Sequence, residues 1–557
     1  MNKAKAFANN DVVLLVWTYD QPIPGCLGFC IKRKNVNSSK EVTLESMVGF
    51  KKESIEKREF KPTNKWPIQK FNWRDFSAES GQTYQYTIIP MIGASDNLKE
   101  ANANRHLETN IVTLSPGKGK VKAYFNRGIL STQFVSSQVP KSVLGIPNYK
   151  ILLERLKQPG DQLRNSLADE LRFALMNLFD KALAENGECY CALYELNDAE
   201  LLEKILKAGS KVHIILSNTG PEDETNQVSR ESLHKSKVDI IDRFVSSGHI
   251  GHNKFVIYVN SKGKAQTVMT GSTNWTYTGL CAQSNNSIII DSEKLAAHYM
   301  DFWNRLKDDD SKQEIQFRNE NNKQRKVTIG DTKISLWFSP NTKQKNKTAN
   351  SKLPEDMKEV FEAMEGAIKS LLFLSFQPGN PSIIEKAAEI QIANPDLFIR
   401  GAATDLEAVE NSNVTLFHRG IKDPVIVGAL ELKDDFAFWM AELLKSSPRA
   451  HAIIHDKIVV IDAFTDNCVV ITGSHNLGYR ASYNNDENLL IIRGDKELAT
   501  SYATHILDIY DHYRWRYFLN KQKGRGSKFE GLKPEDTWQE PYFNDKRGES
   551  IDRRFWL

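Results

Sequence analysis

The sequence has few cysteines, and their spacing excludes the common metal and disulfide patterns. The six cysteines of this 557-residue chain are scattered and mostly embedded in apolar runs: Cys26, Cys30, Cys189, Cys191, Cys281 and Cys468. The spacings CxxxC and CxC occur without a nearby histidine, so they do not match the usual ligand sets of zinc sites. We therefore expect a reduced protein without a metal site at these cysteines, and the sequence indicates no other cofactor.

Long apolar runs and a strong net charge are also lacking. No stretch approaches the roughly 20 apolar residues of a membrane-spanning helix, and the run at residues 12–16 is too short for the core of a signal peptide. The net charge of +4 neither requires nor excludes nucleic acid, because local clustering decides electrostatic binding. Hydrophobic content of 40% and charged content of 26% are ordinary for a globular protein. We expect a cytoplasmic protein without a transmembrane segment.

The chain is longer than one hydrophobic core usually serves, so two or three domains are expected. Residues 1–116 contain several short alternating or β-branched runs separated by turn residues, which predicts a small antiparallel β-sandwich. We expect its core to contain Trp17, Trp66, Trp73 and Tyr86. The segment resembles a fibronectin type III or immunoglobulin-like module. Such modules position or recruit other molecules, which leaves a protein partner open.

One stretch near the carboxyl end combines the side chains of a phosphate site. His455 and Lys457 stand two apart in a β-branched run, so they lie on the same face of a strand and can reach one ligand. A second predicted strand delivers Gly473, Ser474 and Asn476 at its end. An imidazole, an ammonium, a hydroxyl and an amide together suit an anionic oxygen and include a possible nucleophile.

The same pattern occurs once more, about 200 residues earlier. There His252 and Lys254 are followed by Gly271, Ser272 and Asn274. The order HxK, then GSxN, resembles the signature of the phospholipase D superfamily, the HKD phosphodiesterases. The resemblance implies an active site built from two such halves, in which one histidine attacks phosphorus and the other protonates the leaving group. This chain carries both halves.

The first copy departs from the family pattern at two positions. It has Val259 where the second has Asp462, and alignment of the apolar runs places Asn286 opposite Glu487. By strand parity Asp462 lies at a strand end and off the catalytic face, so we interpret it, with Gly271 and Gly473, as structural. The missing glutamate matters more, because a carboxylate fixes the tautomer of a histidine nucleophile. Glu487 is therefore expected to serve whichever histidine attacks.

The two halves repeat the order of their predicted elements. Residues 334–338, 355–368, 371–376 and 397–400 match residues 121–125, 168–184, 189–194 and 211–216. We predict an α/β fold of two pseudo-repeated phospholipase D-like lobes, preceded by the all-β sandwich. The first lobe covers residues 117–318, and the second covers residues 319–557 with a helix and tail at its end.

The resemblance implies hydrolysis through a covalent phosphohistidine, without a metal. The family assigns attack to the first-half histidine, here His252, with His455 as the acid. Glu487 supports the nucleophile, and the oxygens of the phosphate are held by the remaining motif residues: Lys254, Lys457, Ser272, Ser474, Asn274 and Asn476.

The substrate is left open among three interpretations. Basic segments at residues 318–326 and 343–347 and an aromatic and arginine-rich helix at 506–517 favour a nuclease, and the alternatives are solvated segments and a helix packed on the lobe. The polar loop at 217–226 is a candidate lining of a substrate entrance. The alternative enzyme is a phospholipase D or phosphatidyl transferase acting on phospholipids. The third is a degenerate, non-catalytic scaffold that binds nucleic acid or protein, which Val259 and Asn286 allow. A recruiting module would fit a bacterial defence system, and the sequence does not fix the oligomeric state.

Overall fold

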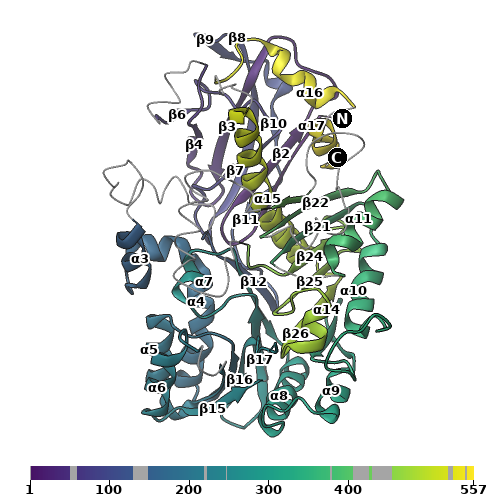
Figure 1. Cartoon of the computed structure of the whole chain (residues 1–557). Helices are drawn as coiled ribbons and strands as arrows, with labels where there is room; N and C mark the ends of the chain where they lie inside the picture. Colours follow the sequence, from purple (N-terminus) through teal and green to yellow (C-terminus); the bar gives the residue numbers. More distant parts are fainter. Residues whose placement is uncertain are drawn as a thin grey trace. The chain divides into compact units, whose positions relative to one another are not determined.

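The computed structural model describes residues 2–50, 59–128, 149–218, 223–245, 248–376, 379, 381–404, 426–428, 454–524, 531–545 and 548–556. The chain divides into two compact units (Figure 1). In the described part, the first unit contains residues 2–116 and those from 514 onward, and the second contains residues 117–513. We describe each unit by itself.

The first unit is built from antiparallel strands. One sheet has the order β1(Lys3–Ala8), β2(Val13–Thr18), β7(Asn72–Asp75). The other has the order β10(Leu107–Glu108), β8(Thr83–Ala94), β3(Cys26–Asn35), β4(Glu41–Thr43), with β9(Asn97–Glu100) and β11(Val112–Thr113) also paired to β8. A short pair, β5(Glu45–Ser46) and β6(Lys61–Pro62), and a 3-10 turn, η1(Ala103–Arg105), complete it.

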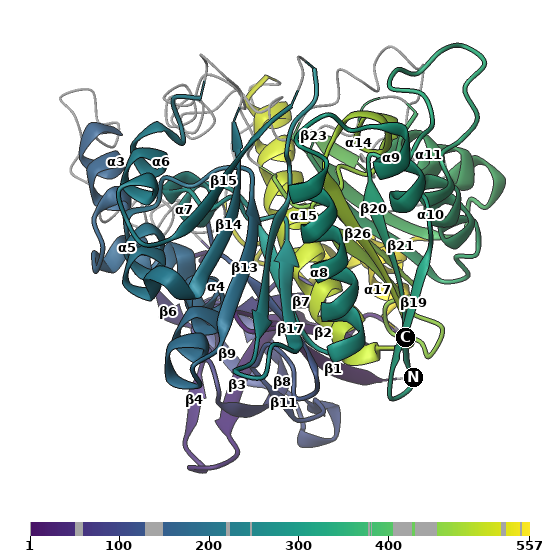
Figure 2. The same cartoon turned by 90° about the horizontal axis from the view of Figure 1, so that it is seen from below.

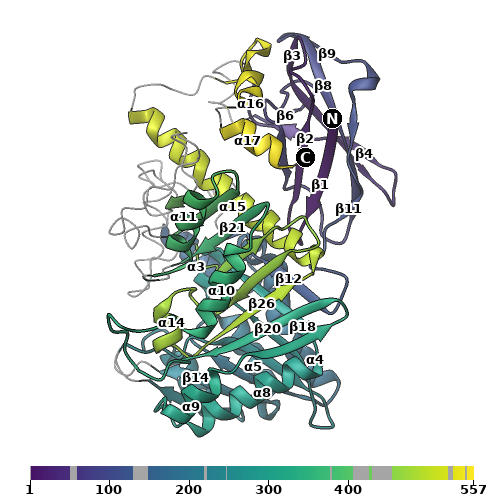
Figure 3. The same ribbon diagram turned by 90° about the vertical axis from the view of Figure 1, so that its right-hand side faces the viewer.

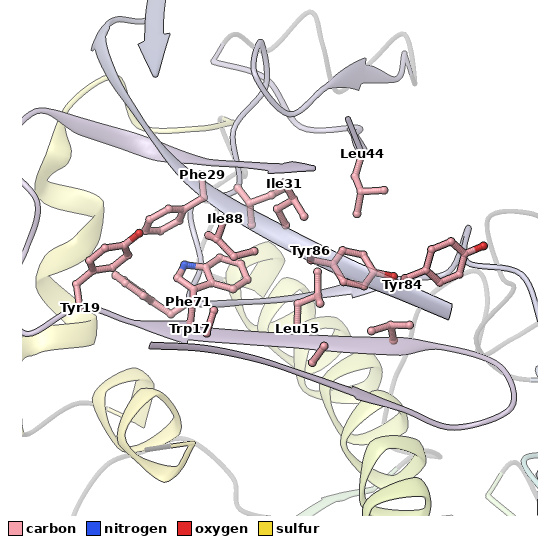
Figure 4. Packing of buried hydrophobic residues seen from close by; sticks show 14 of the residues in the cluster. Leu15, Trp17, Tyr19, Phe29, Ile31, Leu44, Phe71, Tyr84, Tyr86 and Ile88 are labelled. Carbon is pink, nitrogen blue, oxygen red and sulfur yellow. The ribbon is translucent and has the colours of Figure 1, made fainter. Parts of the chain in front are cut away.

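The facing sides of these sheets bury one aromatic core (Figure 4). The rings of Trp17 and Phe29 lie 5.3 Å apart, edge to face, and Phe71 packs against Phe29 at the same distance. Tyr86 is fully buried and donates its hydroxyl hydrogen bond to Asp75, which satisfies the polar end of the ring. Of the other predicted core residues, Trp66 is buried and Trp73 packs against the core while partly exposed.

The carboxyl-terminal segment completes this core, which corrects the predicted domain boundary. η4(Asp536–Gln539), α16(Glu540–Phe543) and α17(Gly548–Phe555) belong to the first unit, and Figure 3 shows α17 beside β2. Trp538 is buried, packs 5.8 Å from Phe29 and donates to the Cys26 carbonyl. The sequence placed this segment in the second lobe because it follows that lobe in the chain. Its apolar partners lie some 500 residues upstream, where only tertiary packing brings them together.

The second unit contains two mixed sheets with the same strand order. The first sheet runs β12(Val121–Phe125), β18(Asn286–Asp291), β17(Ala265–Gly271), β16(Lys254–Val259), β13(Glu188–Leu193), β14(Val212–Asn218), β15(Asp239–Phe244). After an additional edge strand, β19(Arg325–Ile329), the second runs β20(Thr332–Ser339), β26(Glu487–Arg493), β25(Val469–Gly473), β24(Ile458–Ile461), β21(Ser370–Ser375), β22(Phe398–Ala403), β23(Ile426–Gly428). Below, residues 117–318 are called the first half and residues 319–513 the second half.

Helices and 3-10 turns connect the strands of both halves. The first half has α3(Tyr149–Lys157), α4(Gln162–Ala184), α5(Ala199–Ala208), η2(Gly209–Lys211), α6(Gln227–His234), α7(Tyr277–Cys281) and α8(Glu293–Asp308), and α9(Ile315–Asn321) leads out of it. The second half has α10(Glu355–Glu365), α11(Ile383–Ala393), α14(Tyr479–Asn484) and α15(Lys496–Gly524). Side-chain caps begin several of them, including Asp198 at α5 and a capping box of Ser382 and Glu385 at α11.

Helices α8 and α15 connect the two halves (Figure 2). Tyr299 of α8 donates to Asn488 of the second half at 3.0 Å. Tyr502 of α15 donates to Asn286 of the first half at 3.1 Å. Each helix therefore bonds to the sheet of the other half, at the strands β18 and β26 that neighbour the GSxN strands β17 and β25.

Two segments that the sequence offers as candidates for nucleic-acid contact have structural roles. Residues 318–326 form the end of α9 and the start of β19, and the buried Arg318 donates to the carbonyls of Gln313 and Tyr483. In the 506–517 segment, Tyr510 and Tyr513 are buried in the unit; the side chains after residue 514 lie outside the described residues, as does part of the loop at 217–226. The segment at 343–347 is exposed.

Candidate active site

The two HxK motifs face each other between the halves of the second unit. His252 and Lys254 lie at the start of β16, and His455 and Lys457 lie just before β24. Both histidines are about 3% exposed, and their ring centroids lie 6.4 Å apart. The backbone leading to each motif bonds to the other half: His455 N donates to Ser284 O at 3.0 Å. The arrangement therefore depends on both halves.

The two lysines lie in equivalent positions beside the histidines. Lys254 Nζ donates to His252 O at 2.8 Å, and Lys457 Nζ donates to His455 O at 2.7 Å. Each ammonium also lies over an aromatic ring, at 5.0 Å from Tyr194 and 5.3 Å from Phe376. The sequence missed these rings, because each comes from a neighbouring strand end with no motif around it.

Burial changes the acid–base behaviour of all four groups. Burial lowers the pKa of Lys457 to about 7, although Glu487 and Asp456 oppose the shift. Burial and the neighbouring Lys457 lower the pKa of Lys254 well below its usual value. Burial and the two lysines also lower the pKa values of His252 and His455. Burial destabilises the charge of the two ammonium groups, and an anion bound beside them would stabilise it. The site therefore favours an anionic ligand.

The histidines differ in the partner of their Nδ1 atoms. His252 Nδ1 lies 2.7 Å from Glu487 Oε1, at ion-pair distance but without the alignment of a hydrogen bond. His455 Nδ1 lies 3.0 Å from Asn285 Oδ1, and the Asn285 amide nitrogen donates to Gly279 O, which fixes the amide orientation. We therefore assign the neutral-ring proton to Nδ1 in both, leaving Nε2 for chemistry.

Glu487 is fully buried and held from two sides. Asn476 N donates to its Oε2 at 3.1 Å, and Asn485 Nδ2 donates to its Oε1 at 2.9 Å. Burial raises the pKa of Glu487, and His475, Asn485 and the two lysines oppose that shift. A carboxylate with several donors retains its charge better than an isolated buried one.

The pairing of Asn286 with Glu487 expected from sequence is wrong by one residue. Asn286 N donates to Ser272 Oγ, and Asn488 N donates to Ser474 Oγ, both at 3.1 Å. Asn286 is thus equivalent to Asn488, and the counterpart of Glu487 is Asn285. The apolar runs that follow allow either register, but matching Asn286 to Asn488 would have given the correct one.

The serines of the GSxN motifs hold this asparagine pair. Ser272 and Ser474 have no exposed surface, and Ser272 Oγ also donates to Asn285 Oδ1 at 2.8 Å. The asparagines of the GSxN motifs have other contacts. The side-chain amide nitrogen of Asn274 donates to Glu195 at 2.6 Å. Among the described residues, the Oδ1 atoms of Asn274 and Asn476 are buried without a hydrogen-bond partner.

The motif glycines lie where backbone chains nearly touch. A Cβ atom on Gly271 would lie 2.3 Å from Asn286 O, and one on Gly473 would lie 2.4 Å from Asn488 O. Both residues also have positive φ angles, +155° and +137°. Only glycine allows the asparagine strands to approach this closely.

Asp462 lies outside the site and organises a turn. Its carboxylate accepts hydrogen bonds from the backbone of Ile368, Lys369 and Ser370. In the first half, Val259 has no such side chain, and Gly187 packs there instead: its Cβ would lie 2.4 Å from Val259 O. The two halves thus close the same turn by different means.

Among the residues that the structure describes, no group of three or more His, Cys, Asp and Glu side chains is arranged to hold a metal ion.

Comparison with known proteins identifies the domain that carries this site. The profile of the family described as cardiolipin synthase, PLD-like domain, matches residues 177–307 and 434–509. These segments include both HxK and both GSxN motifs. These two segments of the chain are similar to a phospholipase D-like domain.

The chain also matches two curated relatives. Proteins named phospholipase D from Rickettsia conorii and Rickettsia felis are 29% and 30% identical to this chain over 133 residues. The matched region is 23% of this chain and 60% of each relative, so the chain spans three-fifths of their length.

Similar solved structures include phosphatidylserine synthase from Haemophilus influenzae, with 12% identity and a TM-score of 0.41 over 68% of this chain and 98% of that one. Yeast tyrosyl-DNA phosphodiesterase is also similar, with 12% identity and a TM-score of 0.33 over 58% of this chain and 88% of that one.

Proposed function

We propose that this chain is a phosphodiesterase of the phospholipase D superfamily that works through a phosphohistidine intermediate, most favourably on nucleic acid. The observation that carries the proposal is the pair of buried histidines, His252 and His455, 6.4 Å apart between centroids with a lysine beside each. Two imidazoles supply a nucleophile and an acid, and two ammonium groups neutralise the phosphoryl oxygens.

His252 is the nucleophile in this proposal. The Glu487 carboxylate faces its Nδ1 and supports the positive charge that the ring acquires on attack. His252 Nε2 forms a bond to phosphorus as the bond to the leaving oxygen breaks, and protonated His455 transfers its Nε2 proton to that oxygen. His455 then removes a proton from water, the resulting hydroxide attacks phosphorus, and the phosphorus–nitrogen bond breaks to release His252.

The neutral amide opposite His455 suits an acid. Asn285 orients the ring through Nδ1 but, unlike a carboxylate, adds no charge that would hold the proton. Burial and the two lysines lower the pKa of His455. A bound phosphodiester anion between the lysines would offset their charge and raise that pKa, so substrate binding itself protonates the acid.

The lysine pair supplies charge that other phosphodiesterases obtain from a cation, so we propose metal-independent turnover. Lys254 and Lys457 are buried on either side of the histidines. We propose that Asn274 and Asn476 donate hydrogen bonds from their amide nitrogens to the phosphoryl oxygens, since both lie in the GSxN loops beside the histidines.

Features around the site support nucleic acid as the substrate class. Tyr479, three residues after Asn476, has Lys347 of the exposed 343–347 segment 4.5 Å above its ring. In the first half, Tyr277 follows Asn274 by three residues and has Lys157 at 5.6 Å. A half-buried ring with a lysine on each side of the site suits stacked bases and backbone phosphates.

The second candidate is a phospholipase D or phosphatidyl transferase, which the names of the matched family and relatives favour. Among the helices of the described residues, none has the length and apolar composition to cross a membrane. A binding scaffold without catalysis is less favoured, because both histidines and both lysines are present and converge.

We interpret the first unit as a fibronectin type III-like module that recruits a protein partner to the enzyme, as in an assembly of bacterial cytoplasmic defence. Its two antiparallel sheets around one aromatic core support this interpretation. Co-purification tests this interpretation. The full chain should retain a protein partner, and variants substituted on the surface of the module should lose it.

The deciding experiment is cleavage of labelled single-stranded DNA, duplex DNA and RNA in excess EDTA. Wild-type protein should cleave at least one, and His252→Asn and His455→Asn should not. Mass spectrometry of quenched wild-type enzyme should find the phosphate on the His252 peptide. Cleavage of phospholipid vesicles alone would replace the substrate class, and turnover by either histidine variant would contradict the two-histidine mechanism.

A further inference from the structure

A buried histidine and aspartate lie behind Glu487 and are not used by the proposed mechanism. His475 is the variable residue of the second GSxN motif and is 1% exposed. Its Nε2 lies 3.2 Å from Asp356 Oδ2, and its Nδ1 accepts the Leu477 N–H at 3.0 Å. Asp356 is fully buried and also accepts from Ser482 and Asn341.

The imidazole holds a turn with constrained backbone geometry. Leu477 has a φ of +57°, a conformation that residues other than glycine rarely adopt. The hydrogen bond from Leu477 N to the ring lies within this turn, and Asp356 anchors the ring to α10. The position of the backbone from 475 to 477 therefore depends on both nitrogens of His475.

This turn provides a donor to Glu487. Asn476 N, the amide between His475 and Leu477, donates to Glu487 Oε2 at 3.1 Å. The other oxygen, Oε1, lies 2.7 Å from His252 Nδ1. A continuous set of contacts thus runs from Asp356 through His475 and the Asn476 amide to Glu487 and His252.

The first half has a different residue at the equivalent place. Thr273 follows Ser272 as His475 follows Ser474, and its hydroxyl donates to Asn286 O at 3.0 Å. A threonine cannot bridge to a distant carboxylate, so the histidine and aspartate support the Glu487 side of the site alone.

We propose that His475, held by Asp356, is a positioning residue that fixes Glu487 against His252. The inference rests on the proposed function, because the position of Glu487 affects turnover only if His252 is the nucleophile. The titratable groups that face Glu487 are His252, Lys254, Lys457 and His475.

The hydrogen bonds of His475 define the protonation state in which it positions Glu487. Burial opposes a charge on His475, but Asp356 and Glu487 outweigh it and raise the pKa of the ring above its usual value. The Leu477 N–H points at the Nδ1 lone pair and so opposes a second proton there. We assign the neutral ring with its proton on Nε2, directed at Asp356.

Two substitutions of His475 distinguish the roles of its two ring nitrogens. Asparagine places an acceptor near Nδ1 and keeps the bond from Leu477 N–H, whereas glutamine places a donor near Nε2 and keeps the link to Asp356. His475→Gln should lower kcat by about 10- to 100-fold with KM within about twofold, because Glu487 shifts while the phosphate contacts remain. His475→Asn should retain more activity than His475→Gln, since it preserves the turn that carries the Asn476 amide.

The pH profile gives a readout that general destabilisation does not move. Loss of the Asn476 donor disfavours ionised Glu487 and raises its pKa, so the acid limb of kcat/KM should move to higher pH in His475→Gln. In a Glu487→Gln background, His475→Gln should change kcat by less than about twofold, because the two residues act through one contact. Independent, multiplicative losses would overturn the inference.

A substrate-free measurement separates this inference from the proposed function. The ring nitrogens of the 12 histidines can be followed by NMR after selective labelling. The His252 signals should shift in His475→Gln and in Asp356→Asn, and unchanged signals would overturn the inference even if no substrate is turned over. Asp198→Asn, which removes a buried carboxylate paired with Arg164 in the first half, is the control for general loss of packing and should leave those signals in place.

Discussion

At the scale of single residues, the site is asymmetric. A carboxylate, Glu487, faces one histidine and an amide, Asn285, faces the other, although the surrounding serines, asparagines and glycines are equivalent. A charged partner stabilises an imidazolium, and a neutral partner only orients the ring. This asymmetry supports the different roles proposed for two otherwise matched histidines.

Substitution of Glu487 and of Asn285 tests which histidine is the nucleophile. Glu487→Gln should lower kcat by about 10²- to 10⁴-fold, the range of a lost acid–base partner, whereas Asn285→Ala should lower it less. Single-turnover kinetics should show that Glu487→Gln slows formation of the phosphoenzyme. A larger loss in Asn285→Ala would reverse the roles of His252 and His455.

The buried lysine pair predicts the dependence of activity on pH. Burial lowers the pKa of Lys457 to about 7, so the free enzyme loses this positive charge as the pH rises through about 7, and kcat/KM should fall there. A bound phosphate anion favours the charged form, so the alkaline limb of kcat should lie at higher pH than that of kcat/KM. In Lys457→Arg the alkaline limb of kcat/KM should move to higher pH, because arginine stays protonated. If the alkaline limbs of wild-type kcat, wild-type kcat/KM and Lys457→Arg kcat/KM lay at the same pH, this role for the lysine would be contradicted.

At the scale of secondary-structure elements, the turns before the strands position the site. Asp462 has a φ of +50° and accepts from three successive backbone amides ahead of β21. β21 pairs with β24, which follows directly from His455 and Lys457. The family aspartate of the second motif therefore acts on strand geometry.

Removal of this carboxylate should reduce stability more than chemistry. Asp462→Ala leaves the amides without their acceptor, so we expect a loss of about 1–3 kcal/mol in the free energy of unfolding. Denaturant titration measures it, and kcat per folded molecule should change little. Asp466→Ala, at an exposed aspartate of the same turn, is the matched control and should have almost no effect. Equal losses in both variants would contradict the structural role of Asp462.

At the scale of the whole molecule, the chain returns to its first unit after completing the second. Trp538 packs into the core formed by β2 and β3 and bonds to the Cys26 carbonyl, and Gln539 exchanges two hydrogen bonds with Ile23. The first unit is therefore complete only when the carboxyl-terminal segment is present.

Truncation of that tryptophan should loosen the first unit selectively. Trp538→Ala in the full chain should cost about 3–5 kcal/mol, as for other large-to-small core changes. Hydrogen exchange should show lost protection in β2, β3 and β7, and protection in β16 and β24 of the second unit should be retained. Phe60→Ala, at an exposed ring of the same unit, is the control. Unchanged exchange in β3 would show that the segment adds little to this core.

The sequence identified the motif residues and their HxK spacing, because spacing along the chain is a local property. It also determined the repeated order of strands, since periodicity and turn residues are local. Tertiary structure decided the rest: the partner of His455 is Asn285, Arg318 is buried, and residues from 514 onward belong to the first unit. These depend on register and packing between segments hundreds of residues apart, which no local pattern encodes.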